Sequence, residues 1–257
     1  MLGAIVGDII GSVHEYIGTK TTEFPLFVPG SDFTDDSVLT VAVADWILTG
    51  GDLGDVLSGY ARRFPGRGYG TMFSKWASGD DRRPYNSYGN GSAMRVSPVG
   101  FAFDTLDEVL AWAERSAAVT HDHAEGIRGA QATATAIFVA RHERDKDAIK
   151  RAVESRFGYD LGARLDHIRP TYDFTELCRR TVPPALVAFL ESTDYESAIR
   201  NAISLGGDAD TLACICGGVA EAYYGGVPDA LVARARGLLD TRLLDVVDRF
   251  RARFSVP

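Results

Sequence analysis

Two short acidic sequences stand directly before long apolar segments, and together they could bind metal. The first is TDDS at 34 to 37, and the second is GGDADT at 206 to 211, which contains Asp208 and Asp210. Each alone is typical of a helix N-terminus, where Thr, Asp and Ser cap free N–H groups and acids complement the helix dipole. The segments that follow are unusually apolar, however, so additional carboxylates would be drawn toward the interior, where charges need partners.

If the two acidic sequences face each other, four carboxylates and two threonine hydroxyls meet in one cleft. Like charges about 4 Å apart repel by roughly 4 kcal/mol per pair at an effective dielectric near 20, so divalent cations would stabilise the cluster. A ligand set made of oxygen atoms favours Mg²⁺, Mn²⁺ or Ca²⁺ over zinc or copper. Two ions would balance the four carboxylates. Sequence alone leaves open whether the two sequences meet.

Three further features allow two interpretations each. Asp8, inside the first apolar segment, either orients a metal ligand or satisfies backbone N–H groups. The loop at 87 to 92 could present N–H groups to a phosphate, although such residues also form ordinary turns, and the turn is favoured when the loop is considered alone. Arg95 either reaches a phosphate or pairs with an acid, and the abundance of arginine in this chain favours the pairing.

The elements that must position these residues are predicted to be helices. Residues 53 to 64 repeat apolar side chains at the period of 3.6 that is typical of a helix, and sustained alternation, the mark of a strand, is hard to find. Thr105 with Glu108 and Thr193 with Glu196 have capping-box spacing. We therefore expect an all-α fold of about a dozen helices.

Three segments are apolar almost all round and should be central helices: 2 to 13, 37 to 48 and 211 to 224. The first carries glycines at four-residue spacing, which would let a neighbouring helix approach closely. The glycine-rich segment from 65 to 98 differs, and it predicts a long functional loop around a short helix.

Composition limits the class of protein. With 257 residues, 46% hydrophobic and 24% charged, the chain predicts one domain spanning 1 to 257. The opening apolar segment contains an acid and no basic region precedes it, so neither a membrane span nor a signal peptide is expected, and the chain is predicted to be cytoplasmic. A net charge of -8 argues against a nucleic-acid binder. Three cysteines without a C-x-x-C pair predict reduced thiols.

Five motifs together resemble the ADP-ribosylglycohydrolase family. They are GDIIGSVHE (7 to 15), TDDS (34 to 37), SYGNGSAMRVSP (87 to 98), TH (120 to 121) and GGDADT (206 to 211). Their order and spacing fit the family over residues 1 to about 225. The resemblance implies a compact orthogonal bundle of helices around a central dinuclear Mg²⁺ or Mn²⁺ site. It also implies hydrolysis of the bond between ADP-ribose and a modified side chain.

The resemblance also implies roles for particular residues. The metal ligands would be Thr34, Asp35, Asp36, Asp208, Asp210 and Thr211. Glu15 would lie on a mobile segment over the scissile bond and, with Asp36, would be a catalytic carboxylate. The diphosphate and proximal ribose would be held by Ser87, Tyr88, Gly89, Asn90, Gly91 and Ser92, with His121 near the phosphates. His14 departs from the family pattern, which often has a bulkier apolar residue before the glutamate.

Two other functions fit the same residues. A catalytically inactive relative would bind ADP-ribosyl groups or act as an immunity protein, although the complete ligand set and Glu15 count against it. A dinuclear phosphohydrolase would instead cleave a nucleotide pyrophosphate. The acceptor stays open among arginine, serine, a nucleobase or a small molecule. An ADP-ribosylated protein is thus one candidate partner, nucleic acid is a partner only for a nucleobase linkage, and no membrane partner is expected.

Overall fold

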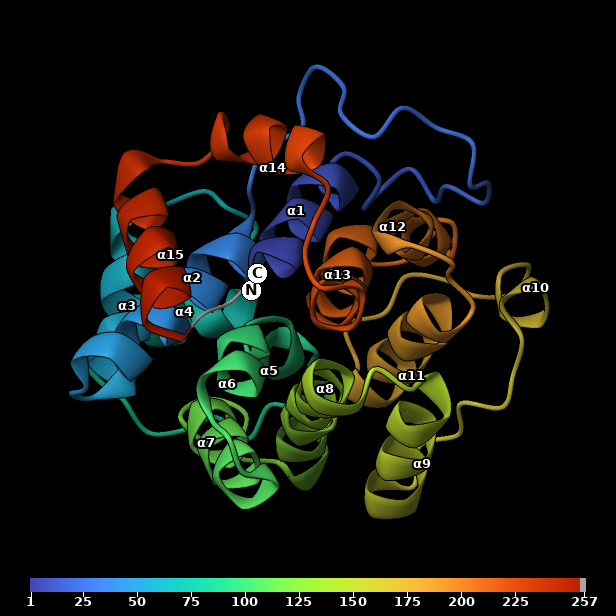
Figure 1. Cartoon of the computed structure of the whole chain (residues 1–257). Coiled ribbons are helices and arrows are strands. Elements are labelled where there is room, and N and C mark those ends of the chain that lie inside the picture. Colours follow the sequence, from blue (N-terminus) through green and yellow to red (C-terminus); the bar gives the residue numbers. More distant parts are fainter. Residues whose placement is uncertain (255–257) are drawn as a thin grey trace.

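A computed structural model of the chain describes residues 1–254, which fold into fifteen helices joined by loops, with no β-strand in this part of the chain (Figure 1). The all-α prediction is confirmed. The helix count exceeds the expected dozen because α5 and α10 have only four residues each, too few for a periodic signal. The helices are α1 (Leu2–Gly11), α2 (Asp35–Thr49), α3 (Leu53–Arg63), α4 (Thr71–Ser78), α5 (Gly91–Met94), α6 (Ser97–Ala102), α7 (Leu106–Ala118), α8 (Ala124–Glu143), α9 (Lys146–Phe157), α10 (Leu165–Ile168), α11 (Cys178–Leu190), α12 (Tyr195–Ile203), α13 (Ala209–Tyr224), α14 (Asp229–Arg236) and α15 (Thr241–Phe254).

The centre of the fold is the pair α1 and α13, which lie side by side in Figure 1. Every residue of α1 is buried. A Cβ atom at Gly7 would lie 2.1 Å from the carbonyl oxygen of Ala213, and one at Gly217 would lie 2.3 Å from that of Gly3. Only glycine allows the two backbones to approach this closely. At the start of α1 the ammonium group of Met1 pairs with the carboxylate of Glu221 in α13, and both groups are buried.

The remaining apolar segment, 37 to 48, lies in α2, which packs beside this pair as its composition predicts. It packs against α1, α3, α6 and α15, while α8 supports α13 from another side together with α11 and α12. The first turns of α2 and α13 contain the two acidic sequences. The packing of α1 with both helices therefore determines how those two first turns face each other.

Several helices begin and end at residues of the types that favour helix termini. Gly50 and Gly225 follow α2 and α13 with positive φ of 79° and 76°, and Thr105 accepts the N–H of Glu108 at the start of α7. The expected capping box at Thr193 is wrong. The carboxylate of Asp194, one residue later, caps α12 by accepting the N–H of Ser197 at 2.7 Å, and the Ser197 hydroxyl accepts the N–H of Asp194 at 3.0 Å.

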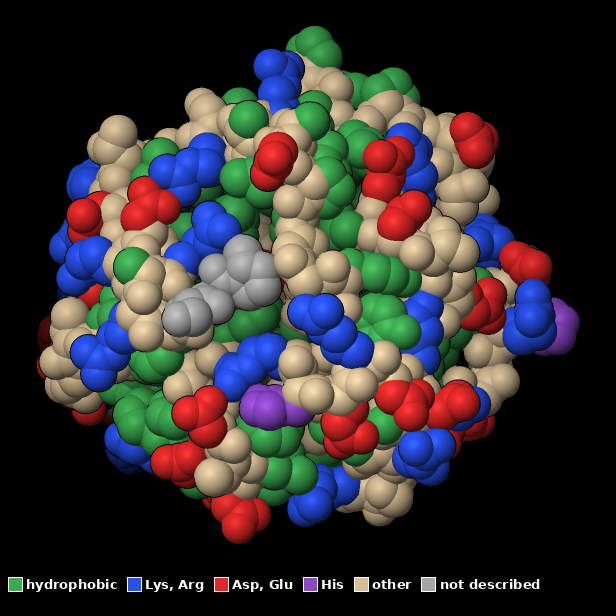
Figure 2. Space-filling view, viewed as in Figure 1, with side chains coloured by type: hydrophobic (Ala, Val, Ile, Leu, Met, Phe, Trp, Pro, Cys, Tyr) green, Lys and Arg blue, Asp and Glu red, His purple; other side chains and the backbone are tan. Residues whose placement is uncertain are grey.

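The surface is mixed in charge. On the face drawn in Figure 2, basic and acidic side chains alternate over the helices without a large region of one sign. No helix within residues 1–254 has both the length and the hydropathy of a membrane span. Cys178, Cys214 and Cys216 are buried free thiols, as predicted.

Candidate active site

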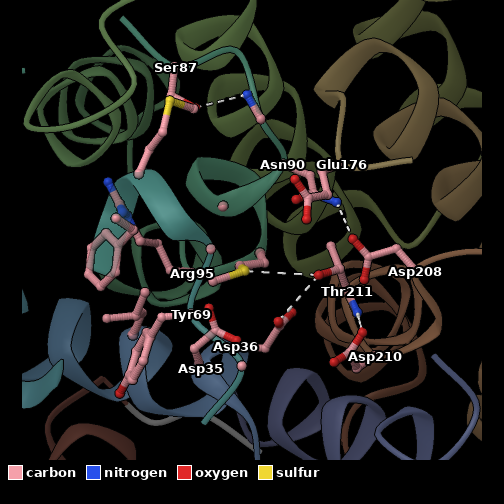
Figure 3. Close-up of a pocket in the computed structure, with 18 of the residues that line it drawn as sticks. Asp35, Asp36, Tyr69, Ser87, Asn90, Arg95, Glu176, Asp208, Asp210 and Thr211 are labelled. Carbon is pink, nitrogen blue, oxygen red and sulfur yellow. Dashed lines mark hydrogen bonds between the residues drawn. The ribbon is translucent and has the colours of Figure 1, made fainter. Parts of the chain in front are cut away.

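A cavity of about 500 Å³ opens beside the first turns of α2 and α13 (Figure 3). Most residues singled out from the sequence line it: Glu15, Asp35, Asp36, Ser87, Gly89, Asn90, Gly91, His121, Asp208, Asp210 and Thr211. Thr34, Tyr88 and Ser92 are not among the lining residues. One cavity thus joins the acidic helix starts to the glycine-rich loop.

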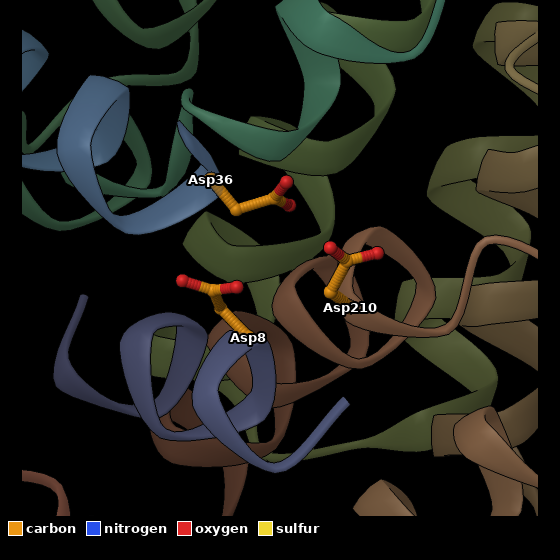
Figure 4. A group of neighbouring side chains, drawn as sticks. All are labelled: Asp8, Asp36 and Asp210. Atoms are coloured by element: carbon orange, nitrogen blue, oxygen red, sulfur yellow. The ribbon is translucent and has the colours of Figure 1, made fainter. Parts of the chain in front are cut away.

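The two acidic sequences lie against each other. The Thr211 hydroxyl donates to Asp36 Oδ2 at 3.2 Å, across 175 positions of sequence. One carboxylate oxygen from each of Asp8, Asp36 and Asp210 lies within 4.8 Å of the other two (Figure 4). These three side chains come from α1, α2 and α13, so the cluster exists only because those helices pack together.

Asp8 holds the start of α2 in place. Its carboxylate accepts the backbone N–H of Thr34 and of Ser37, each at 3.1 Å, and the Thr34 hydroxyl at 2.6 Å. The Ser37 hydroxyl donates to it as well. Asp8 therefore satisfies backbone N–H groups and also orients the segment that carries the cavity carboxylates. Because the Thr34 hydroxyl is turned to Asp8 and also caps Asp36, it does not face the cavity.

The electrostatics of the cluster fit a bound cation. Burial raises the pKa of Asp8 to about 6. Burial, and then the neighbouring carboxylates, raise the pKa of Asp36 and of Asp210 well above the usual range. Asp36 Oδ1 is buried without a hydrogen-bond partner in the described residues. Oxygen atoms that repel one another and lack donors are suited to a hard dication, which would replace the protons they otherwise retain.

A second carboxylate group overlaps the first. Oxygens of Glu15, Asp208 and Asp210 lie within 4.8 Å of one another, so Asp210 belongs to both groups. Glu15 is half-buried in the turn that follows α1. Its pKa is raised by burial first and then by the charges of Asp208 and Glu176.

His14 determines how the Glu15 segment packs. The imidazole is buried, its Nδ1 lies 2.8 Å from the Thr19 hydroxyl oxygen, and its ring centroid lies 4.7 Å from that of Phe24. Burial lowers the pKa of His14, which favours the neutral form. The histidine thus packs into the protein as an apolar residue would, and the next residue, Glu15, lines the cavity.

The glycine-rich loop is tied to the acids and to a distant segment. The Asn90 amide donates to Asp208 Oδ2 at 2.7 Å, and the Asn90 backbone N–H donates to the Glu176 carbonyl at 2.6 Å. An isolated antiparallel bridge joins Gly89 to Leu177. This pairing brings the Glu176 side chain into the cavity. No sequence motif marks Glu176, so its place in the cavity became evident only from the tertiary structure.

The remaining loop residues point elsewhere. Tyr88 is exposed and packs its ring 5.3 Å from that of His123. Ser92 is buried and donates to the Gly126 carbonyl at 2.7 Å. Tyr69 and Tyr85 also line the cavity.

His121 and Arg95 complete the wall opposite the acids. A Cβ atom at Gly91 would lie 3.2 Å from His121 Nε2, so the imidazole closely borders the loop. Arg95 is buried, and its recorded partners are the Ser116 carbonyl and the Thr120 hydroxyl rather than an acid. The expected pairing of Arg95 with an acid is therefore wrong within the described residues.

This fold and this cavity match a known class of protein. The profile of the ADP-ribosylglycohydrolase family matches residues 1–257, so the chain belongs to that family. Membership supports an ADP-ribosyl hydrolase activity on ADP-ribosylated substrates. The acidic clusters could bind metal.

Individual relatives span nearly the same length. The chain is 27% identical to human ADP-ribosylhydrolase ARH3, over 95% of this chain and 90% of that protein. It is 22% identical to the ADP-ribosylarginine hydrolase Tri1 of Pseudomonas putida, over 91% of this chain and 72% of that one. A solved structure titled ADP-ribosylglycohydrolase-related protein complex superposes with a TM-score of 0.65 at 26% identity, covering 92% of this chain and 95% of its own.

Proposed function

We propose that this protein is a metal-dependent hydrolase that cleaves the glycosidic bond between ADP-ribose and a modified acceptor. The observation that carries this proposal is the convergence of Asp36, Asp208 and Asp210 in one cavity with the loop at 87 to 91. The carboxylates could bind metal ions, which in turn could bind the ribose hydroxyls. The backbone N–H groups of the glycine-rich loop could bind the diphosphate.

The proposed cofactors are two Mg²⁺ or Mn²⁺ ions. The residues proposed to hold them are Asp35, Asp36, Asp208, Asp210 and Thr211. Thr34, expected as a sixth ligand, donates its hydroxyl to Asp8 instead and with Asp8 orients the start of α2. Asp35, Asp36, Asp208 and Asp210 all line the cavity, and the charge of these four carboxylates would be balanced by two such ions. Hard dications, when bound, supply positive charge that orients a ribose diol and acidifies a nearby water.

The chain's own residues would bind the substrate and move protons. Gly91 lets the loop pack closely against His121, since an added Cβ atom would lie 3.2 Å from Nε2, and the loop is proposed to hold the diphosphate beside that imidazole. In hydrolysis a water oxygen bonds to the anomeric carbon as the water gives up one proton, and the acceptor atom leaves with the electrons of the broken bond and takes up a proton. Glu15 is proposed to transfer that proton, with Asp36 as the second carboxylate. A raised pKa suits a group that changes protonation near neutral pH.

We propose that the ADP-ribose is attached to an arginine side chain of the acceptor. Glu176 lines the cavity beside Glu15, and a carboxylate at that position would lower the energy of a neighbouring cation. A guanidinium group would complement these acids better than a neutral serine or a nucleobase. The name of the Pseudomonas putida relative, ADP-ribosylarginine hydrolase, points the same way.

A panel of mono-ADP-ribosylated peptides and oligonucleotides tests this function with Mg²⁺, Mn²⁺ and EDTA. We expect release of intact ADP-ribose, dependent on metal, and a loss of more than about 100-fold in Asp36→Asn and Asp208→Asn. Asp147→Asn, in the exposed first turn of α9, is the matched control and should keep full activity.

Each other outcome identifies a rival function. Release of AMP instead of ADP-ribose would indicate the pyrophosphate hydrolase. Calorimetric binding of ADP-ribose without turnover of any linkage would indicate an inactive binding protein. Full activity in Asp208→Asn would contradict the proposed site.

A further inference from the structure

Arg95 is a buried cation that has no carboxylate partner among residues 1–254. Its guanidinium is fully buried, and Nε and Nη1 have no partner in the described residues. Nη2 donates to the Ser116 carbonyl at 2.7 Å and to Thr120 Oγ1 at 2.9 Å. Burial lowers its pKa to about 10, which still leaves it charged at neutral pH. Burying a charge without an opposite charge beside it costs free energy. We therefore ask what the two hydrogen bonds of Arg95 contribute to the site.

The contact with Thr120 fixes the direction of a hydrogen bond. A guanidinium can only donate, so Thr120 Oγ1 accepts from Arg95. The hydroxyl still has one proton of its own, and His121 Nδ1 lies 2.7 Å away. If Nδ1 carried a proton, it would point at an oxygen that already accepts from a positive charge, and the hydroxyl proton would be left to the phenol of Tyr85, the other polar neighbour of Thr120. The contact with Nδ1 is the shortest hydrogen bond that this hydroxyl makes in residues 1–254, which favours Nδ1 as its acceptor. If the Thr120 hydroxyl donates to Nδ1, the hydroxyl proton has an acceptor and the Nδ1 lone pair has a donor.

The other nitrogen of His121 then carries the ring's proton. Burial, and then the charge of Arg95, lower the pKa of His121 well below the usual range, so the ring is neutral and has one N–H. With Nδ1 accepting, that N–H is at Nε2. Nε2 lies beside Gly89 and Gly91, whose added Cβ atoms would be 3.7 and 3.2 Å from it, at the wall of the cavity.

We propose that Arg95, acting through Thr120, holds His121 in the Nε2-protonated tautomer, so that the imidazole always donates a hydrogen bond to an oxygen of the bound ADP-ribosyl group. Arg95 and Thr120 are positioning residues, since neither needs to contact the substrate. The identity of the ligand rests on the proposed function, whereas the tautomer is a property of the free protein.

Nitrogen NMR of histidine-labelled free protein tests the tautomer directly. His121→Asn identifies the His121 signals among the five histidines. We expect Nδ1 to be the unprotonated nitrogen in wild type from pH 6 to pH 8, and we expect Thr120→Val to show both tautomers. A proton on Nδ1 in wild type would overturn the proposal.

Calorimetry with ADP-ribose tests the consequence for binding. Thr120→Val should weaken affinity about tenfold, the effect of losing one hydrogen bond to a charged group, and Thr120→Ser should restore it. Thr135→Val is the control, because this buried hydroxyl in α8 has no partner, and its affinity should match wild type. Circular dichroism verifies that each variant is folded.

A double-mutant cycle separates positioning from general disruption. In a His121→Asn background, Thr120→Val should have no further effect on affinity, because Thr120 acts only through the imidazole. The same tenfold loss in both backgrounds would refute the proposal. If wild type binds no ADP-ribose, the proposed function fails instead, and the nitrogen spectrum still decides the tautomer.

Discussion

Asp8 and Asp36 show how one residue type serves two purposes in the same cluster. Asp8 accepts four hydrogen bonds from the start of α2, while Asp36 leaves Oδ1 without a partner. A carboxylate whose lone pairs are occupied by donors is stabilised by them, whereas one that lacks donors needs a cation or a proton. Asp36 is therefore the better candidate ligand, and Asp8 supports it.

At this scale we predict an unusual dependence of stability on pH in the metal-free protein. The folded state holds the Asp8 proton up to about pH 6, and the ordinary value is 3.8, so between these values the folded chain binds more protons than the unfolded chain. Stability is then highest near pH 4 and falls as pH rises through 6. Asp8 alone contributes at most about 3 kcal/mol, and Asp36 and Asp210 act in the same direction.

Urea unfolding in EDTA from pH 4 to pH 7 measures this slope. Asp8→Asn should make it shallower, since the titrating group is gone. The ion pairs of Asp81 and Asp240 act in the opposite direction, but their arginine partners lower the pKa of each carboxyl to about 2, so their contribution changes mainly below pH 4. A stability that increases steadily from pH 4 to pH 7 would contradict the assignment.

At the scale of elements, the close approach of α1 to α13 determines the shape of the site. Asp8 lies in α1 and Asp210 in the first turn of α13, and their separation depends on how deeply the two backbones interlock. A Cβ atom at Gly11 would lie 2.5 Å from the Cα of Asp210 itself. By allowing α1 and α13 to approach closely, the glycines determine how far apart the carboxylates of the cluster lie.

Gly7→Ala should destabilise the protein by about 2 kcal/mol or more. Alanine gains about 1 kcal/mol of helix propensity, but its Cβ would meet backbone atoms of Ala213 that cannot rotate away. Gly59→Ala in α3 is the matched control, because nothing lies within 4 Å of its added Cβ, and it should stabilise by about 0.5 to 1 kcal/mol. Urea midpoints measure both, and equal effects at the two positions would disprove the close-packing argument.

At the scale of the whole molecule, the candidate site assembles from segments that span most of the chain. Glu15, Asp36, Asn90 and Asp210 face one cavity although nearly 200 residues separate the first from the last. An unfolded chain cannot hold these oxygens together, so a cation that binds them binds the folded state and stabilises it.

Magnesium should therefore raise the melting temperature of the protein. At a concentration 100 times the dissociation constant the stabilisation is about 2.7 kcal/mol, or roughly 5 to 10 °C for a domain of this size. Differential scanning calorimetry measures the increase, which should be larger at pH 8 than at pH 5, because protons compete for the same oxygens. Asp36→Asn should abolish it, and an undiminished increase in that variant would place the ion elsewhere.

Local patterns were enough to predict the helices and most of the cavity. A period of 3.6 identified the helix at 53 to 64, because it reflects one buried face and needs no knowledge of the neighbours. The three central helices were identified by apolar residues on nearly every side, which is typical of a helix buried all round. The acidic sequences and the glycine-rich loop were found because each is a continuous stretch of residues, and the resemblance to a family rests on such stretches.

Only the tertiary structure decided which atoms face one another. It turned the Thr34 hydroxyl away from the cavity toward Asp8, brought Glu176 in through a bridge to the loop, and connected Arg95 to His121 through Thr120. The physical reason is that these contacts join residues about 25 to 90 positions apart. Their geometry depends on how deeply the helices pack, and that information is carried by no single stretch of sequence.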